Sequence, residues 1–325
     1  MKKRINIKVL DFPNVHPYSR WPYWELIEKH FDINLTDRPD YVLDLGDQYQ
    51  HHWYDDCVKI LFEQECNSCD FSKHDYIIGF DDLTFGDRYI RIPLFARWPS
   101  WTRYLNRLRM SDKEMLDRPF CSAVISNDYM GDPLRRDFIE RLAQYKPIAM
   151  GGRYKNNVGG RVKDKIDFCR GYKFNLALEN ASYPGYTTEK IMEAYAADTL
   201  PVYYGNPQIE TDCRLESMVR IKDRDDIERA VAEIIRLDTD DEAYLEKMRE
   251  SPFAEQDLSS YSQRLEEFLF NVFDQPLAQA RRRTNIGFAH GIQHHVSRLM
   301  RMDYYVVQTK MKFDAALRKV KRIMP

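Results

Sequence analysis

Residues 172–207 gather the side chains of this sequence that are best suited to binding a nucleotide. The stretch reads YKFNLALENASYPGYTTEKIMEAYAADTLPVYYGNP. Lys190 places a cation beside a predicted helix start, where free N–H groups attract phosphate. The carboxylate of Glu189 is suited to accepting hydrogen bonds from ribose hydroxyls. These residues favour a nucleotide site, although ordinary first-turn charges of a surface helix would give the same spacing.

The elements that position these side chains form a predicted strand–helix–strand unit. Residues 174–180 alternate and are apolar enough for a strand, and residues 200–205 form a second strand that stops at Gly-Asn-Pro. Residues 187–198 carry apolar side chains at helical spacing, with Thr187 or Thr188 as the cap. Such a βαβ unit belongs to a parallel sheet, whose ligands bind at the carboxyl ends of the strands.

The segments YKFNLALEN, GYTTEK and LPVYYG closely resemble the donor-binding motif of the α1,3/1,4-fucosyltransferases, glycosyltransferase family 10, and are most similar to its bacterial members. The resemblance covers roughly residues 40–275 and is strongest over residues 120–207. It implies GDP-fucose as the donor. It also implies an α/β fold of the GT-B type, in which two Rossmann-like domains face a cleft.

The resemblance assigns donor-binding roles to several residues. Arg135, in SNDYMGDPLRRDFIERL, would bind the diphosphate together with Lys190, and Glu189 would bind the ribose hydroxyls. Asn180 and Tyr186 match motif positions near the phosphate and the fucose. Four further residues are expected to line the same cleft: Ser126, Asn127, Tyr154 and Lys155. Bacterial relatives often carry Arg at the last of these positions, so no bidentate contact is expected there.

A general base is expected at Glu63 or Glu65, in ILFEQECNSCDF, after a predicted strand over residues 58–62. The family places such a carboxylate shortly before a segment resembling DYIIGFDDLTFGDRYIRIPL. Alignment on FEQE favours Glu63, whereas counting back from Asp75 favours Glu65, and both stay open. The implied mechanism is a single inverting displacement in which two protein cations hold the departing GDP. No metal or other cofactor is expected.

Length and composition indicate a globular protein of two α/β domains. The chain has 325 residues, of which 43% are hydrophobic and 31% charged. Predicted strands and helices alternate in both halves, with a helical connector over residues 98–118. We expect an acceptor domain with the general base over residues 1–118, a donor domain over residues 119–275 and a basic amphipathic tail over residues 276–325.

The tail differs in charge from the rest of the chain. It holds eleven Lys and Arg against two Asp, a net charge of +9, which leaves −11 for residues 1–275. Val296, Met300 and Tyr304 begin an apolar stripe on a predicted helix. This pattern favours binding to an anionic membrane surface, while packing on the body of the protein and formation of a homodimer stay open. Nucleic acid is not an expected partner, because stacking aromatics are scarce among the basic residues.

The N-terminal sequence MKKRINIKVLDFPN fits neither a signal peptide nor a membrane span. We therefore expect a cytoplasmic protein, peripheral on the inner face of the cell membrane, with six reduced cysteines. No metal site is expected from three short pairs that lack further ligands at suitable spacing: Cys66 with Cys69, His51 with His52, and His290 with His294.

The resemblance and these residues together imply transfer of L-fucose from GDP-fucose, with an α1,3 linkage, to the N-acetylglucosamine of a β-galactosyl-N-acetylglucosamine (LacNAc-type) oligosaccharide or glycolipid. The product would belong to surface glycan or lipopolysaccharide synthesis. An enzyme of the same fold that uses another GDP-sugar, or makes an α1,4 or α1,2 linkage, is the alternative. A non-catalytic nucleotide-sugar-binding protein would be expected to lack the base.

Overall fold

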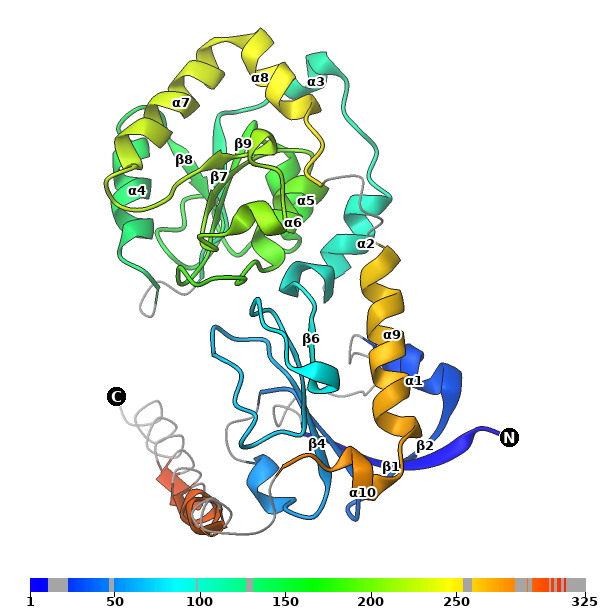
Figure 1. The fold of residues 1–325 in the computed structure, drawn as a ribbon. Coiled ribbons are helices and arrows are strands. Elements are labelled where there is room, and N and C mark those ends of the chain that lie inside the picture. The colour runs from blue at the N-terminus through cyan, green and yellow to red at the C-terminus, as the bar shows by residue number, and fades with distance from the viewer. Residues whose placement is uncertain are drawn as a thin grey trace. The chain divides into compact units, whose positions relative to one another are not determined.

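The computed structural model describes residues 1–10, 23–46, 50–97, 99–126, 131–253, 259–283, 291, 294–303, 305–306, 309–310 and 313 (Figure 1). The chain forms two compact units. Unit 1 comprises Met1–Gly79, Thr84–Ile90 and Arg264–Pro325, and unit 2 comprises Phe80–Leu83 and Arg91–Gln263.

The unit boundaries differ from the boundaries expected at residues 118 and 275. Part of the predicted connector belongs to unit 2, because Tyr104 lies in the same apolar core as Ile191 and Tyr195. Most of the last predicted helix of the donor domain belongs to unit 1. The two units are therefore not consecutive segments of the chain.

Unit 1 is built on a six-stranded sheet in the order β2-β1-β3-β4-β5-β6. Its strands are β1 Lys3–Leu10, β2 Phe31–Leu35, β3 Tyr41–Asp44, β4 Val58–Phe62, β5 Tyr76–Gly79 and β6 Tyr89–Arg91. The pairs β1–β2, β1–β3, β3–β4 and β4–β5 are parallel. Every residue of β3, β4 and β5 is buried. Covered on both faces, such strands read as nearly continuous apolar runs.

The α-helices of unit 1 include α1 (Trp24–His30), the larger part of α9 (Ser259–Asp274) and α10 (Leu277–Ala280). In α9, the ring of Phe273 lies 4.8 Å from that of Tyr41 in β3, and the ring of Phe268 lies 6.1 Å from that of Tyr76 in β5. Lys3 Nζ donates hydrogen bonds to carbonyl groups at the end of α9, including that of Phe273 at 2.8 Å. Residues of α9 from Arg264 onward thus complete the core of this unit.

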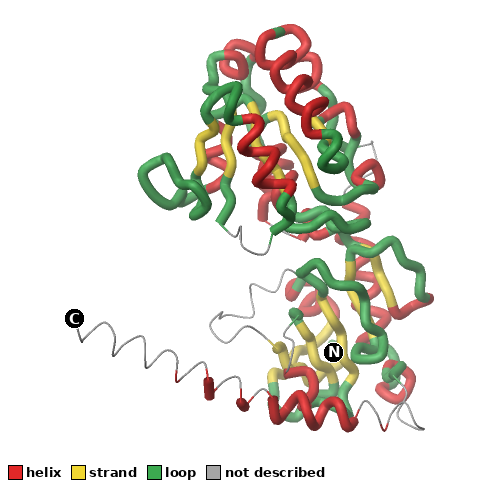
Figure 2. The backbone as a smooth tube through the Cα atoms, turned by 90° about the vertical axis from the view of Figure 1, so that its left-hand side faces the viewer, coloured by secondary structure: helices red, strands yellow, loops and turns green. Residues whose placement is uncertain are grey.

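Unit 2 is a three-layer α/β sandwich (Figures 1 and 2). Its parallel sheet has the order β11-β10-β9-β7-β8, from β7 Cys121–Ala123, β8 Ile148–Met150, β9 Phe174–Leu178, β10 Leu200–Tyr204 and β11 Val219–Arg220. One core packs its strands against α3 (Asp112–Leu116), α4 (Leu134–Leu142), α7 (Ile227–Thr239) and α8 (Asp241–Arg249). The other core involves α2 (Pro99–Leu105), α5 (Lys165–Arg170) and α6 (Glu189–Ala196).

The predicted strand–helix–strand unit is confirmed as β9, α6 and β10. The cap of α6 is Thr188 and not Thr187, since its side chain accepts a hydrogen bond from the backbone N of Lys190. The expected connector forms two short helices, α2 and α3, with a break between them. Two short strands, β2 and β11, were not predicted. The six cysteines are free thiols, as expected.

Three consecutive arginines after α10 bind the chain back onto unit 1. The buried carboxylate of Asp75 accepts hydrogen bonds from the backbone N of Arg282 (2.8 Å) and of Arg283 (2.7 Å), and from Nε of Arg283 (2.8 Å). It also accepts one from the backbone N of Lys59 at 2.7 Å. Arg281 donates to the carbonyl of Asp55 at 2.8 Å. These basic residues of the tail thus bind acceptors inside unit 1.

The described part of the tail from His294 onward is helical, and one of its faces packs on the rest of unit 1. The buried hydroxyl of Ser297 lies 2.9 Å from Nδ1 of His52, in the short helix η2 (Gln50–Trp53). Arg301 donates to the carboxylate of Asp55 at 2.8 Å. Packing on the body of the protein, one of the possibilities left open for the tail, is therefore what this face of the helix does.

The opposite side of the tail helix is open to solvent and carries apolar side chains, with His295, Asp303 and Lys310 exposed beside them. Four side chains, 52–67% exposed, recur there at helical spacing: Leu299, Met302, Val306 and Phe313. We call them the outer apolar face. Val296 and Met300 of the predicted stripe are less exposed, at 36% and 38%. No helix among the described residues is long and apolar enough to cross a membrane.

We expect the substitution Asp75→Asn to lower the free energy of unfolding of unit 1 by about 3 kcal/mol, because it removes the charge that compensates a largely buried guanidinium. The exposed Asp56, which pairs with Arg281 at 3.2 Å, is the matched control. Asp56→Asn should change stability by less than about 1 kcal/mol. Urea unfolding followed by hydrogen exchange in β4 and β5 measures both; equal effects would contradict the role given to Asp75.

Candidate functional site

A fully buried carboxylate, Glu179, lies at the centre of the site. It follows β9 directly and accepts hydrogen bonds from Nζ of Lys190 (2.8 Å) and from the backbone N (2.8 Å) and hydroxyl (2.7 Å) of Thr188. Because a buried charge without partners is strongly destabilising, this network fixes the start of α6 against the end of β9. Burial would lower the pKa of Lys190, but Glu179 and Glu189 outweigh burial and raise that pKa above its ordinary value. Lys190 is therefore a positioned cation.

Among the site residues predicted from this stretch are Asn180 and Lys190, but Glu179 was not predicted. A signal was present, because a carboxylate at the end of an apolar strand needs either solvent or a partner. The choice between those two possibilities required the position of α6, which sequence spacing does not fix.

Two glycines allow close packing around this end of the sheet. A Cβ atom on Gly205, after β10, would lie 2.3 Å from Cγ of Glu179. Gly185 has a φ of 80°, and a Cβ atom there would lie 2.2 Å from the carbonyl oxygen of Phe80. A larger residue at either position would displace the loop or the carboxylate, so glycine is required at both.

A second buried network holds the loop before α6. The Thr187 hydroxyl donates to the carboxylate of Asp212 at 2.6 Å, and the Asn206 amide donates to that hydroxyl at 3.0 Å. Asn206 also accepts a hydrogen bond from the backbone N of Gly185 at 2.9 Å. Burial raises the pKa of Asp212, although its 2.7 Å pair with Arg91 opposes this. The backbone that precedes Glu189 is thus fixed on both sides.

Arg135 reaches the same end of the sheet from the first turn of α4. The backbone N of Asp132 donates to the carbonyl of Asn180 at 2.8 Å, and the Tyr204 hydroxyl donates to the Asp132 carboxylate. The Arg135 side chain is buried and crosses Gly131 so closely that a Cβ atom there would lie 2.4 Å from Nη1. The structure therefore brings the segments of Arg135 and Asn180 together at the carboxyl ends of the strands.

Two carboxylates one helical turn apart, Glu189 and Glu193, lie partly exposed on α6. Glu189 is 3.6 Å from Nζ of Lys190, and Glu193 is 3.4 Å from Nζ of Lys165 in α5. Burial would raise the pKa of Glu189, but Lys190 and Lys165 lower it below its ordinary value. Burial raises the pKa of Glu193 to about 7, against the opposing effect of Lys165. Glu189 is thus ionised at neutral pH and suited to accepting hydrogen bonds.

Tyr186 lies inside unit 2. Its side chain is buried, and its ring is 5.2 Å from the ring of Phe80 in an edge-on arrangement. Its backbone N donates to the carbonyl of Tyr183 at 3.1 Å. Tyr186 therefore supports the loop between β9 and α6 through packing.

The four further residues predicted for the cleft are placed differently from one another. Tyr154 is partly buried, and its backbone N donates a hydrogen bond to the carbonyl of Ile125 at 3.0 Å. Ser126, the next residue, is exposed. Lys155 has a φ of 45° and pairs with Glu140 at 2.7 Å, so its charge is already partnered. Asn127 lies outside the described residues.

Glu63 and Glu65 follow β4 in unit 1, as predicted. Glu63 is buried, and its Oε1 accepts hydrogen bonds from the backbone N of Gln64 (3.1 Å) and of Glu65 (3.0 Å). Its own backbone N donates to the carbonyl of Ile78 in β5 at 3.1 Å. Glu65 is exposed. The first carboxylate is therefore held in place by the backbone, whereas the second faces solvent.

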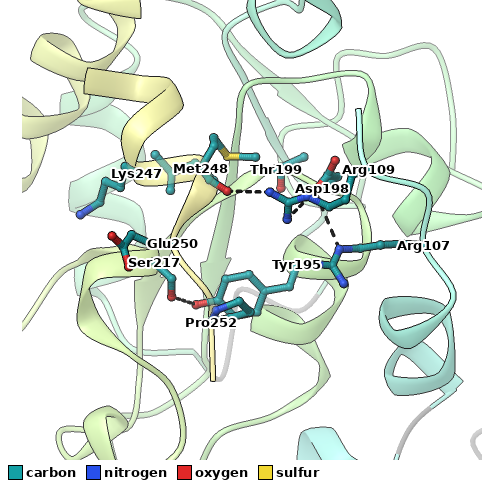
Figure 3. Close-up of a pocket in the computed structure, with 11 residues that line it drawn as sticks. Arg107, Arg109, Tyr195, Asp198, Thr199, Ser217, Lys247, Met248, Glu250 and Pro252 are labelled. Atoms are coloured by element: carbon teal, nitrogen blue, oxygen red, sulfur yellow. Dashed lines mark hydrogen bonds and ion pairs between the residues drawn. The ribbon is translucent and has the colours of Figure 1, made fainter. Parts of the chain in front are cut away.

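A pocket in unit 2 lies at the opposite, amino-terminal end of β10 (Figure 3). Asp198 there has a φ of 55°, lies 3.1 Å from Arg109 and accepts a hydrogen bond from the backbone N of Met110 at 2.8 Å. Arg107 lies on the same carboxylate at 3.8 Å. These contacts anchor the segment between α2 and α3. Ligands of parallel sheets bind at the other end, so we assign this pocket a structural role.

Comparisons with known proteins agree with the arrangement. Residues 7–98 match the α-(1,3)-fucosyltransferase FucT N-terminal domain, and residues 110–249 match the C-terminal domain of glycosyltransferase family 10 (fucosyltransferase). The α-(1,3)-fucosyltransferase FucT of Helicobacter pylori is 29% identical over 278 residues, which are 73% of this chain and 57% of that protein. The chain thus spans little more than half the length of this relative.

Solved structures are similar over most of the chain. A crystal structure of an α1,3-fucosyltransferase has a TM-score of 0.76 and 25% identity, covering 88% of this chain and 94% of that one. A crystal structure of α1,3-fucosyltransferase with GDP-fucose has a TM-score of 0.70 and 25% identity, covering 83% and 91%. The two parallel-sheet units have the composition of a GT-B fold. With matches to both domains of the family, this chain belongs to glycosyltransferase family 10.

Proposed function

We propose that this chain is an inverting α1,3-fucosyltransferase that moves L-fucose from GDP-fucose to the N-acetylglucosamine of a β-galactosyl-N-acetylglucosamine acceptor. The observation that carries the proposal is the buried pairing of Glu179 with Lys190, which holds one cation beside the start of α6. The solved relative with GDP-fucose supports the choice of donor. The product would serve surface glycan or lipopolysaccharide synthesis.

Lys190 and Arg135 are proposed to bind the diphosphate, and Glu189 the ribose hydroxyls. A guanidinium can bind two phosphate oxygens at once, and an ammonium acts as a point charge. With the N-terminus of α6, these cations would stabilise the charge that develops on departing GDP. Two protein cations can replace a divalent metal in this task, so we propose that the transfer needs none.

Glu63 is proposed as the general base, with Glu65 as the alternative. Two backbone N–H groups hold the Glu63 carboxylate, so its position is more defined than that of an exposed side chain. In the transfer, the acceptor hydroxyl oxygen would bond to the anomeric carbon of fucose while its proton passes to Glu63. The bond from that carbon to the phosphate oxygen would break, and GDP would leave with the electron pair.

The tail is proposed to bind the inner face of the cell membrane through its outer apolar face. Leu299, Met302, Val306 and Phe313 would enter the lipid interface, as in amphipathic helices that lie on membranes. The side chains of Arg281, Arg282, Arg283 and Arg301 donate hydrogen bonds to acceptors elsewhere in unit 1. The electrostatic share of membrane binding would thus be smaller than the net charge of the tail suggests.

Calorimetric titration in EDTA should show saturable binding of GDP-fucose that is tighter than binding of GDP-mannose or UDP-galactose. Lys190→Met should weaken the binding of GDP-fucose at least about tenfold, because a hydrogen bond to a charged group is lost. In the double variant Glu179→Gln/Lys190→Met, no buried charge is left unpaired. It should fold and still bind weakly.

Lys146→Met, which removes a surface lysine paired with Asp238, is the matched control and should bind GDP-fucose like the wild type. A preference for another nucleotide sugar would contradict the proposed donor. Normal affinity in the double variant would contradict the role of Lys190.

Glu63→Gln should lower kcat by about 10²–10⁴-fold, the usual contribution of a general base, because the amide cannot accept the proton. Binding of GDP-fucose should stay unchanged. Glu65→Gln, two residues away, should keep kcat near that of the wild type. Initial rates with a LacNAc acceptor measure both variants; the reverse order of effects would assign the base to Glu65, and two active variants would exclude this strand end.

The double variant Met302→Asp/Val306→Asp should abolish sedimentation of the full chain with anionic phosphatidylglycerol vesicles, because it places charge on the face that would enter the lipid. Ser297→Ala, on the face packed against unit 1, should sediment like the wild type. Wild-type protein that stays in the supernatant would contradict membrane binding. A monomer–dimer change in the double variant would indicate that this face pairs two copies.

A further inference from the structure

Three side chains that can bind metals converge inside unit 1. Asp44 ends β3, His51 lies in η2, and His74 precedes β5 by two residues. Their exposed fractions are 1%, 4% and 4%. Spacing along the sequence paired His51 with its neighbour His52 and predicted no metal site, because ligands this far apart along the chain are not recognisable by spacing.

The three ligand atoms are close enough for one ion. Asp44 Oδ2 lies 3.3 Å from Nδ1 of His51 and 2.8 Å from Nε2 of His74, and all three atoms lie within 4.8 Å of one another. Bonds of 2.0–2.1 Å at tetrahedral angles separate the ligand atoms of Zn²⁺ by about 3.3 Å. Asp44 and His51 already have this separation. The distance between Asp44 and His74 would need to increase by only about 0.5 Å.

The ligand types select a class of metal. Two imidazoles with one carboxylate suit Zn²⁺, Co²⁺ or Ni²⁺ and not Ca²⁺ or Mg²⁺, which prefer oxygen ligands. The other oxygen of Asp44 accepts a hydrogen bond from the backbone N of Gly46 at 3.1 Å. Such an outer contact orients a ligand carboxylate. Each histidine would coordinate through the nitrogen that faces Asp44, with its proton on the other ring nitrogen.

We propose that Asp44, His51 and His74 form a binding site for one divalent transition-metal ion, of which Zn²⁺ is the best-suited example. The three ligands are buried within unit 1, and none of them is a residue proposed to bind the donor or to act as the base, so the role that we propose for the ion is structural. It would fix η2, whose His52 contacts Ser297 and whose Trp53 ring lies 6.3 Å from that of Tyr305. Metal binding would therefore stabilise the surface on which the tail helix packs.

The test is direct measurement of metal binding by the full chain. Protein stripped with a chelator is titrated with Zn²⁺ in competition with a chromophoric indicator, and with Co²⁺ while the visible spectrum is recorded. We expect one Zn²⁺ per chain, a higher Tm with Zn²⁺ but not with Mg²⁺, and slower hydrogen exchange in residues 294–303. Asp44→Asn, which keeps the side-chain volume, should weaken Zn²⁺ binding at least about a hundredfold and remove the Co²⁺ bands.

His294→Gln, which changes a half-exposed histidine of the tail, is the matched control and should bind Zn²⁺ like the wild type. Circular dichroism and GDP-fucose titration confirm that each variant is folded. Lack of saturable Zn²⁺ uptake by the wild type, or equal uptake by Asp44→Asn, would overturn the site and leave three side chains that only share hydrogen bonds. Loss of uptake in His294→Gln would assign the ion to the surface instead.

Discussion

The burial of one carboxylate determines how the site of unit 2 is built. Glu179 has no access to water, so its charge needs donors, and they come from the residues that begin α6. Thr188 thereby becomes the helix cap, and Lys190 becomes a cation of fixed position. Gly205 is needed because the aliphatic part of the Glu179 side chain occupies the space of a side chain there. A stability requirement and a binding requirement are met by the same contacts.

Unit 1 also contains buried carboxylates whose hydrogen-bond partners come from distant segments of the chain. Asp75 is satisfied by Arg283 and by backbone groups of the segment after α10, and Asp44 by two histidines. In each case a buried acid at the end or start of a strand holds a segment that is distant along the chain. Buried ionic contacts add little net stability compared with apolar packing, but removal of one partner is costly. Such contacts specify which segments meet.

The sequence predicted those features that depend on local pattern. Strand β4 has the predicted bounds, and β9 and β10 begin at the predicted residues, since parallel strands covered on both faces are nearly continuous apolar runs. The family resemblance assigned Arg135 and Asn180 to one donor site, and their segments meet at the carboxyl ends of the strands, where ligands of parallel sheets bind. Strand β2 was missed because FDINL is short and only its first residue is buried. Other features depend on tertiary contacts, which residue spacing does not encode. They are the pairing of Glu179 with Lys190, the pairing of Glu140 with Lys155, and the cluster around Asp44.

The chain passes between the two units at four points along its sequence. Unit 1 needs residues from the beginning of the chain as well as residues from Arg264 onward. Neither the N-terminal half nor the C-terminal half of the chain would therefore fold as an independent protein. Lys3, at the start of β1, contacts the carbonyl group of Phe273 at the end of α9. These two segments of unit 1 are therefore neighbours in space. A circular permutant in which the residues from Arg264 onward precede Met1, through a linker long enough to bridge the ends of the chain, would turn unit 1 into a nearly uninterrupted stretch of sequence. Such a unit could be produced and studied by itself.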